Sequence, residues 1–205
     1  MGKLSVYNFV SLNGYFKGLN EDVSWAHQQT SKEQNEFAAE NARSGDILLF
    51  GRKTYEMMAS YWPSGEAKKN ASGIADGMNK AEKIVFSKTL PEAKWMNTRV
   101  IKGNLEEEVK KLKETSEKNM TILGSGSIVN QLAEKGLIDD FMIMIHPVAI
   151  SNGTLFLKDI SNNIQLELTK TKSFPNGVVL LCYQPARHNG PETKQRDRVM
   201  AHETH

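Results

Sequence analysis

The feature that most constrains the fold is a repeated pattern, in which a short apolar run is followed by a polar loop and then by an amphipathic helix. Residues 46–50, 99–101 and 120–123 are such runs, and each leads through a polar segment into residues with helical apolar spacing. Strands separated by helices in this way form a parallel sheet with helices on both faces. The sequence therefore predicts an α/β domain.

The two ends of the chain depart from this pattern. Residues 4–10 are apolar on both faces, so we expect a buried strand there, and the glycine-containing residues 11–18 are expected to form a loop. In the last third, three segments have strand character with no helix between them, namely residues 141–146, 164–169 and 177–183. Residues 174–177 have turn chemistry. The parallel sheet is therefore predicted to end in an antiparallel hairpin.

The length of 205 residues fits one domain. We assign it to residues 1–185 and expect residues 186–205, where the apolar pattern stops, to form a polar tail. The net charge of +2 is small and evenly spread, which argues against a nucleic-acid partner. The single cysteine, Cys182, excludes an intramolecular disulfide and a cysteine-cluster metal site. Since no apolar run approaches the roughly 20 residues that span a bilayer, we expect a cytoplasmic protein with no membrane partner.

Three polar segments each follow a predicted strand and are expected to meet at one edge of the sheet. They are residues 51–54, 87–89 and 124–127, all containing glycine or hydroxyl groups. Helices that begin at the carboxyl ends of parallel strands offer unpaired N–H groups and a favourable dipole to anions. Together the segments could hold a pyrophosphate, with Arg52 as a permanent charge; the alternative is that each is only a cap or a turn. Val129 stands where the dinucleotide fingerprint needs a third glycine, so a Rossmann site is not supported.

Candidates for acid–base chemistry are few. Glu33 and Glu36 fall on the first predicted helix, beside the cleft, where a carboxylate could orient or protonate a polar heterocycle. The alternative is that both are exposed helical charges. His146 is better explained as a structural residue at a strand end, and the histidines of the tail fit no zinc spacing. A hydrolase has little support because no serine lies in a nucleophile elbow.

Seven motifs, taken in order along the chain, resemble the dihydrofolate-reductase-like superfamily. They are SLNGY at 11–15, LFGRKTYE at 49–56, YWP at 61–63, the segment from MN at 78–79 to KIVFSKTL at 83–90, GSGS at 124–127, HPV at 146–148 and GTLF at 153–156. They look more closely like the branch that contains the reductase domain of the bifunctional riboflavin-biosynthesis deaminase-reductase and its stand-alone relatives. The resemblance covers about residues 2–184. It implies a three-layer α/β/α sandwich around a mixed, mostly parallel sheet of about eight strands, NADPH as hydride donor, and a homodimer.

The resemblance also implies particular site residues. The cofactor-binding candidates fall into four groups, one for each part of the cofactor. They are Gly51, Arg52 and Thr54 for the phosphates; Ser87, Lys88 and Thr89 for the adenosine end; Gly124, Ser125, Gly126 and Ser127 for the pyrophosphate; and Gly14 and Lys17 in the loop over the nicotinamide. Arg52 is the candidate for the 2′-phosphate. The catalytic candidates are Asn13, which stands where relatives usually carry Asp, and Glu36. Counting back from Gly51 puts Asn35 at the position of the acid that binds the pterin in dihydrofolate reductases, with Glu36 adjacent. The family chemistry needs no metal.

The resemblance thus predicts an NADPH-dependent reductase that transfers a hydride to a pyrimidine- or pterin-like substrate, most like 5-amino-6-(5-phosphoribosylamino)uracil reductase of riboflavin biosynthesis. The sequence holds no deaminase portion with zinc ligands, so the bifunctional activity is not expected. Dihydrofolate reductase is one alternative, and a nucleotide-binding protein of the same fold without turnover is another. The expected partners are a small heterocyclic molecule and a second copy of the chain, with residues 178–183 as the exposed edge strand.

Overall fold

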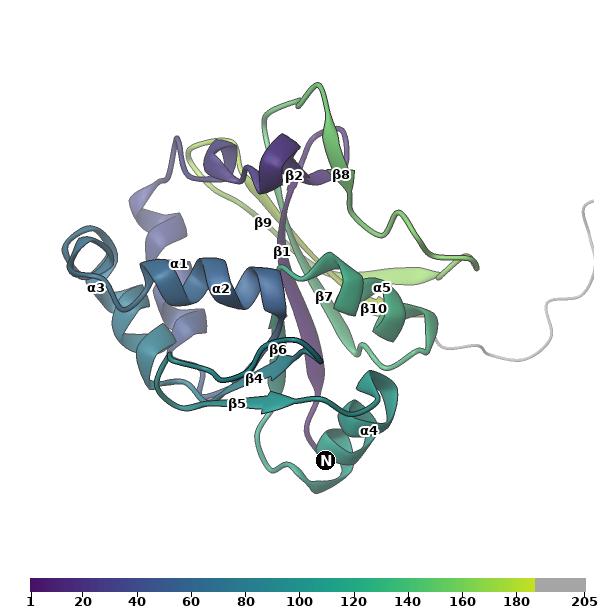
Figure 1. Ribbon diagram of the computed structural model, residues 1–205. Helices are drawn as coiled ribbons and strands as arrows, with labels where there is room; N and C mark the ends of the chain where they lie inside the picture. The colour runs from purple at the N-terminus through teal and green to yellow at the C-terminus, as the bar shows by residue number, and fades with distance from the viewer. Residues whose placement is uncertain (187–205) are drawn as a thin grey trace, which may run out of the picture.

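An eight-stranded sheet forms the centre of the structure, a computed structural model that describes residues 1–186 (Figure 1). The strands of this sheet are β1 (Leu4–Ser11), β3 (Ile47–Gly51), β4 (Lys83–Phe86), β5 (Thr98–Ile101), β6 (Met120–Leu123), β7 (Asp140–His146), β9 (Leu166–Ser173) and β10 (Val179–Pro185). Their order is β5-β4-β3-β6-β1-β7-β10-β9, and every neighbouring pair from β5 to β7 is parallel. β10 is antiparallel to both β7 and β9. The predicted fold class is confirmed.

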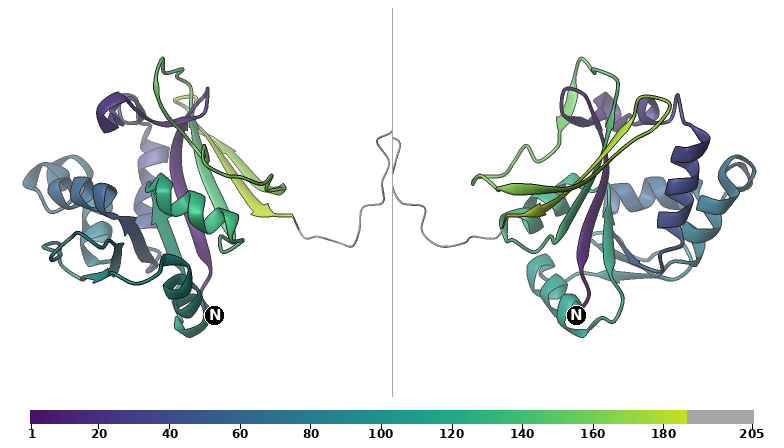
Figure 2. Two further views of the ribbon diagram at one scale, coloured as in Figure 1. Left: turned by 45° about the vertical axis from the view of Figure 1, so that its right-hand side comes forward. Right: turned by 180° about the vertical axis from the view of Figure 1, so that it is seen from behind.

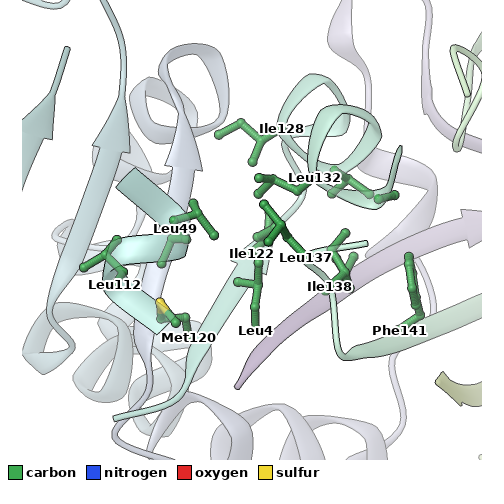
Figure 3. Packing of buried hydrophobic residues seen from close by; sticks show 14 of the residues in the cluster. Leu4, Leu49, Leu112, Met120, Ile122, Ile128, Leu132, Leu137, Ile138 and Phe141 are labelled. Atoms are coloured by element: carbon green, nitrogen blue, oxygen red, sulfur yellow. The ribbon is translucent and has the colours of Figure 1, made fainter. Parts of the chain in front are cut away.

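Within residues 1–186, five α-helices and two short 3₁₀-helices surround the sheet (Figure 2). They are α1 (Lys32–Ala42), α2 (Arg52–Tyr61), α3 (Gly65–Lys80), α4 (Leu105–Thr115), α5 (Gly126–Glu134), η1 (Leu19–Glu21) and η2 (Ser24–Ala26). Side chains alternate across a strand, and β3 shows how this builds two cores. Leu49 packs with residues of α4 and α5, as Figure 3 shows. Leu48 and Phe50 pack instead with residues of α2 and α3 on the opposite face.

A second, two-stranded sheet lies above the carboxyl ends of β1 and β7 (Figure 1). It pairs β2 (Tyr15–Gly18) with β8 (Gly153–Leu155) in antiparallel register. The prediction of a loop over residues 11–18 is therefore wrong for β2. The strand forms because of a partner far along the chain, which local sequence does not reveal. We call β2, β8 and η1 the flap.

The helix α3 was not predicted from the sequence. It contains three glycines and is kinked at Ala71, whose backbone leaves the helical region, so its apolar spacing is irregular. Gly77 is required for packing, since a Cβ there would lie 2.4 Å from the carbonyl oxygen of Ala42 in α1. The buried Lys83 closes the end of the helix by donating from Nζ to the carbonyls of Met78 at 2.8 Å and Ala81 at 2.6 Å.

The antiparallel end of the sheet differs from the prediction in one respect. The turn at 174–177 is present, with Gly177 at φ +81° and the N–H of Phe174 bonded to the carbonyl of Val178. However, residues 178–183 are not the edge: β10 lies between β7 and β9, and β9 is the outer strand. No helix among residues 1–186 is long and apolar enough to cross a membrane. The predicted tail lies outside the described residues apart from Ala186.

Candidate functional site

Two helices begin side by side at the carboxyl edge of the sheet. α2 follows β3 directly, α5 follows β6, and the two leave the centre of the molecule in opposite directions (Figure 1). The N–H of Gly51 donates to Ser125 Oγ at 2.9 Å, and the N–H of Ser125 donates to Thr54 Oγ1 at 3.2 Å. The structure thus brings together three of the residues predicted to hold cofactor phosphates.

The first turns of α2 and α5 differ from those of the other three helices. Side chains cap α1, α3 and α4: Ser31, Ser64 and Asn104 each accept from a backbone N–H of the first turn. Within residues 1–186, the N-cap residues of α2 and α5, Gly51 and Ser125, make no such side-chain cap. Since the first N–H groups of a helix have no partner inside it, these two ends keep donors available for an anion.

The turn between β6 and α5 brings the backbone of Gly124 and Ser125 close to α2. Gly124 and Ser125 have φ of +61° and +55°, both in the left-handed region. A Cβ on Gly124 would lie 3.2 Å from Cγ2 of Thr54, so a larger residue is strained both by its backbone and by its neighbour. Ser125 holds this conformation although it is not glycine, at a cost of order 1–3 kcal/mol. Residues held in sparsely populated backbone regions cluster at functional sites.

Five charged side chains lie near the start of α2. Arg52 Nη1 donates to Glu56 Oε1 at 3.1 Å, and both side chains are nearly half exposed. Glu21 of η1 accepts from Lys17 Nζ at 2.7 Å and from Lys53 Nζ at 3.2 Å, which ties the flap to α2. The hydrogen bond from Lys17, with the weaker one from Lys53, lowers the pKa of Glu21. No local pattern singles out Glu21 or Lys53, because their proximity depends on the fold of the flap.

The segment after β4 forms a compact turn at the same edge. Ser87 Oγ accepts from the N–H groups of Thr89 at 3.2 Å and Leu90 at 3.0 Å. The side chains of Lys88 and Thr89 are exposed. The hydroxyl oxygen of Ser87 therefore accepts hydrogen bonds from its own turn. Lys88 is the charged side chain of this turn. Their assignment to the adenosine end stays a prediction.

The predicted covering loop is fixed at its base by Asn13. Its Oδ1 accepts from Ser11 Oγ at 2.9 Å and from the N–H of Ile150 at 3.1 Å, and its Nδ2 donates to the carbonyl of Ile150 at 2.8 Å. Gly14 follows at φ +89°, and Phe16 of β2 lies so close to Gly126 that a Cβ there would be 2.6 Å from the ring. Asn13 therefore joins the loop after β1 to the loop after β7.

The carboxylates Glu33 and Glu36 of α1 are exposed at the surface. Glu36 has 60% of its side chain exposed, lies 3.8 Å from Lys32 and lines a groove between α1 and α3 of about 560 Å³. Glu33 pairs with Lys172 at 2.9 Å, and Asn35 is exposed. The catalytic assignment of Glu36 stays a prediction to which this position lends no support.

The buried polar residue of α1 is Gln34, which sequence reasoning missed. It is 4% exposed, and its Oε1 accepts from Asn176 Nδ2 at 2.6 Å. Asn176 belongs to the turn between β9 and β10 and also donates to the carbonyl of Gln29. A capping-box pattern, Ser31 followed by Gln34, marks the start of α1, but only the distant Asn176 makes the amide a buried group.

His146 lies at the end of β7 among aromatic side chains. The rings of Phe9 and Trp25 meet its imidazole edge-on, with centroids 5.2 and 5.5 Å away. It is 3% exposed, and within residues 1–186 its Nε2 has no hydrogen-bond partner. Burial, with a smaller contribution from His27, lowers the pKa of His146 to about 4. It is therefore a neutral imidazole at physiological pH.

The family of the chain follows from comparison with known proteins. Residues 3–180 match the RibD C-terminal domain. The chain belongs to the RibD C-terminal domain family. One relative by sequence is YyaP, an uncharacterized protein of Bacillus subtilis. It is 30% identical over 175 residues, which cover 85% of this chain and 90% of that protein.

Solved structures confirm the fold that the resemblance implied. A protein from Shewanella sp. PV-4, described as a riboflavin biosynthesis protein, has a TM-score of 0.71 at 18% identity, over 90% of this chain and 99% of the other. Dihydrofolate reductase from Enterococcus faecalis, solved with NADP(H), has a TM-score of 0.61 at 15% identity, over 90% and 96%. At these identities the likeness establishes the dihydrofolate-reductase-like fold and nothing further.

The carboxyl edge of this RibD C-terminal domain gathers groups of the kind that bind phosphate. Two helix starts without side-chain caps, a left-handed turn at Gly124–Ser125 and the cations Arg52 and Lys53 meet there. Backbone N–H groups and fork-shaped guanidinium groups are the donors that bind phosphate. Among residues 1–186, no group of three or more histidine, cysteine, aspartate or glutamate side chains is placed to hold a metal ion.

Proposed function

We propose that this chain is an NADPH-dependent reductase that transfers a hydride to a pyrimidine- or pterin-like substrate, most like 5-amino-6-(5-phosphoribosylamino)uracil reductase. The observation that carries the proposal is the junction of α2 and α5, where Ser125 links two helix starts that lack side-chain caps. A chain that needed only a stable fold would gain about 1 kcal/mol from capping each helix, as its other three helices do.

Each part of the edge then has a role. The N–H groups at the starts of α2 and α5 bind the pyrophosphate, and Arg52 releases Glu56 to bind the 2′-phosphate. NADPH supplies the hydride, so the protein has to align donor and acceptor and to exclude water. The flap, fixed through Asn13 to the loop after β7, covers the reacting groups.

The substrate would lie beside α1, where the protein offers neutral polar groups. Gln34 and Asn176 are amides, and His146 is uncharged at physiological pH. A neutral lactam such as a pyrimidinedione is matched by amides, whereas a protonated pterin calls for a carboxylate. We therefore place the pyrimidine substrate ahead of dihydrofolate.

Turnover tests the proposal directly. Oxidation of NADPH is followed with 5-amino-6-ribosylamino-pyrimidinedione phosphate and, separately, with dihydrofolate. We expect oxidation with the first and little or none with the second. Oxidation with dihydrofolate alone would reverse the order of substrates. Glu36→Gln belongs in the same assay, because an unchanged kcat would remove Glu36 from the chemistry.

A binding protein without turnover is the second candidate. It is favoured by one observation: the described part of α1 places an amide, and no carboxylate, in a buried position. The proton that accompanies a hydride would then lack an obvious donor in the protein. Binding of NADPH without oxidation across a panel of pyrimidines and pterins would decide for this candidate.

We further propose that the protein is a homodimer in the cytoplasm. The support is the outer strand β9, whose Leu168 is 54% exposed and whose outer backbone edge has no paired strand within residues 1–186. Sedimentation velocity of the wild type and Leu168→Lys tests the dimer. We expect the variant to shift toward the monomer, and an unchanged dimer would place the interface elsewhere.

A further inference from the structure

The sheet opens between β1 and β6 at its carboxyl edge. These two strands pair from Leu4–Met120 only as far as Tyr7–Leu123, whereas β1 continues beside β7 to the pair Ser11–His146. From Asn8 onward, the β6 side of β1 has no paired strand within the described chain. In parallel sheets, ligands occupy such crevices at the carboxyl ends of neighbouring strands whose chains lead apart.

The side chain of Asn8 lies at the base of this opening. Val6 and Val10 face α5, so alternation places Asn8 on the same side of β1. A Cβ built on Gly124 would lie 4.0 Å from Asn8 Oδ1, which sets the amide just below the turn that starts α5. Asn8 is 4% exposed, and among residues 1–186 its Nδ2 has no hydrogen-bond partner.

A buried amide without a partner needs a reason. An unsatisfied buried donor costs about 1–3 kcal/mol, and an apolar side chain of similar size would avoid this. The neighbours Val6 and Val10 show that the face is otherwise apolar. The polar side chain at this point is therefore explained by a ligand that supplies an acceptor.

The strand order indicates which part of a dinucleotide would reach it. The phosphates are proposed to lie at the starts of α2 and α5, after β3 and β6, and the adenosine end at the turn after β4. Continuing along the order β4-β3-β6, the next strand is β1. The end of the dinucleotide opposite adenosine therefore falls at Asn8, beneath the flap residue Phe16, which packs on Gly126.

We propose that Asn8 is a positioning residue for the nicotinamide, donating from Nδ2 to the oxygen of its carboxamide. The inference rests on the proposed NADPH site. An amide matches an amide in donors and acceptors, so one such contact fixes the rotation of the ring and hence the face that points to the substrate.

Binding measurements separate this role from a structural one. Calorimetric titration of the wild type and Asn8→Leu uses NADPH and 2′-phospho-ADP-ribose, which has the same phosphates and no nicotinamide. We expect Asn8→Leu to bind NADPH about tenfold more weakly, the loss of one buried hydrogen bond, and 2′-phospho-ADP-ribose as the wild type does. Asn130→Leu is the matched control, since Asn130 is also buried with an unpartnered amide atom within the described residues, but contacts Asp159 away from the opening.

Thio-NADPH, in which sulfur replaces the carboxamide oxygen, tests whether that oxygen is the acceptor, because sulfur accepts hydrogen bonds poorly. The wild type should prefer NADPH over thio-NADPH several-fold, and Asn8→Leu and Asn8→Ala should not discriminate. Asn8→Leu should also unfold at a temperature equal to or above that of the wild type, because it removes the unsatisfied donor.

Four results would overturn the inference. Equal weakening of both ligands, or a lower unfolding temperature with unchanged NADPH affinity, would make Asn8 structural. Unchanged NADPH affinity alone would remove Asn8 from the site while leaving the proposed function intact. Failure of the wild type to bind either ligand would overturn the proposed cofactor site, and the role of Asn8 with it.

Discussion

The carboxyl edge of the sheet has two parts, which differ in the charge and exposure of their polar groups. At the α2–α5 edge, formed by residues 51–54 and 124–127, backbone donors are left free and cations stand nearby. On the α1 side, formed by Gln34, His146 and Asn176, the polar groups are neutral. Gln34 and His146 are buried, Asn176 is half-buried, and His146 lies among aromatic rings. The first arrangement suits a polyanion, and the second suits an uncharged ring.

The difference also shows how each part is built. The α2–α5 edge comes from strand–turn–helix units, in which the residues that meet are near neighbours of a strand end. The α1 side is assembled from segments far apart in sequence, so each of its contacts depends on the complete fold. Substitutions should therefore act on ligand binding at the α2–α5 edge and on stability at the α1 side.

The largest effect is expected at His146. Its folded pKa of about 4 lies below the ordinary value of 6.5. Between these values the unfolded chain takes up a proton and the folded chain does not, so stability falls as the pH is lowered through this window. The wild type should lose about 3 kcal/mol more than His146→Gln between pH 7 and pH 4 in urea unfolding.

His27→Gln is the comparison variant, since His27 is a second histidine beside Phe9. Its pH dependence should lie between those of the wild type and His146→Gln, because burial also lowers the pKa of His27 and His27 contributes a smaller part of the lowering at His146. If His146→Gln loses as much stability on acidification as the wild type, the imidazole is not the buried, neutral group described above.

Gly124→Val should weaken NADPH binding about 30-fold. The substitution puts a β-branched residue at φ +61° and brings a Cβ to 3.2 Å from Thr54, which costs about 2 kcal/mol and displaces the turn. Gly45→Val carries similar backbone strain, at φ +86°, in a place with open space around the Cβ. It should lower the unfolding temperature without changing affinity; equal affinity losses in both would point to global destabilisation.

Only part of the structure could be predicted from local sequence patterns. Buried strands at 46–50 and 120–123 and the turns after them follow from local patterns, so the edge that joins Gly51 to Ser125 was predictable. The pairing of β2 with β8 was not, because Tyr15 and Leu155 meet only after the whole sheet has formed. The same reason hid Gln34, whose burial is completed by Asn176, and α3, whose Gly73 and Gly77 allow close packing against α1.

Asn13→Ala should separate the flap from the loop after β7. The variant removes the hydrogen bonds to Ile150, so we expect a loss of about 1 kcal/mol in the free energy of unfolding. Asn13→Asp keeps the acceptor and loses the donor, so it should fall between the two proteins. Amide hydrogen exchange should show the change in β2 and β8, and protection unaltered there would show that Asn13 does not hold the flap.

The smallest effect is expected from Glu21→Gln, which tests how far the flap belongs to the α2–α5 edge. Removing the charge frees Lys17 and Lys53 for phosphate, so NADPH should bind about twofold more tightly at low salt, an exposed ion pair contributing little. The gain should vanish at high salt. Weaker binding would mean that the Glu21 contacts hold the flap closed over the ligand.

The most direct test of the account is a fluorescence titration of the wild type and Arg52→Ala with NADPH and NADH. We predict that the wild type prefers NADPH and that the variant loses about tenfold in NADPH affinity with little change for NADH, since Arg52 is assigned to the 2′-phosphate. Binding of neither cofactor by the wild type would contradict the account: the fold would stand, and the α2–α5 edge would need another ligand.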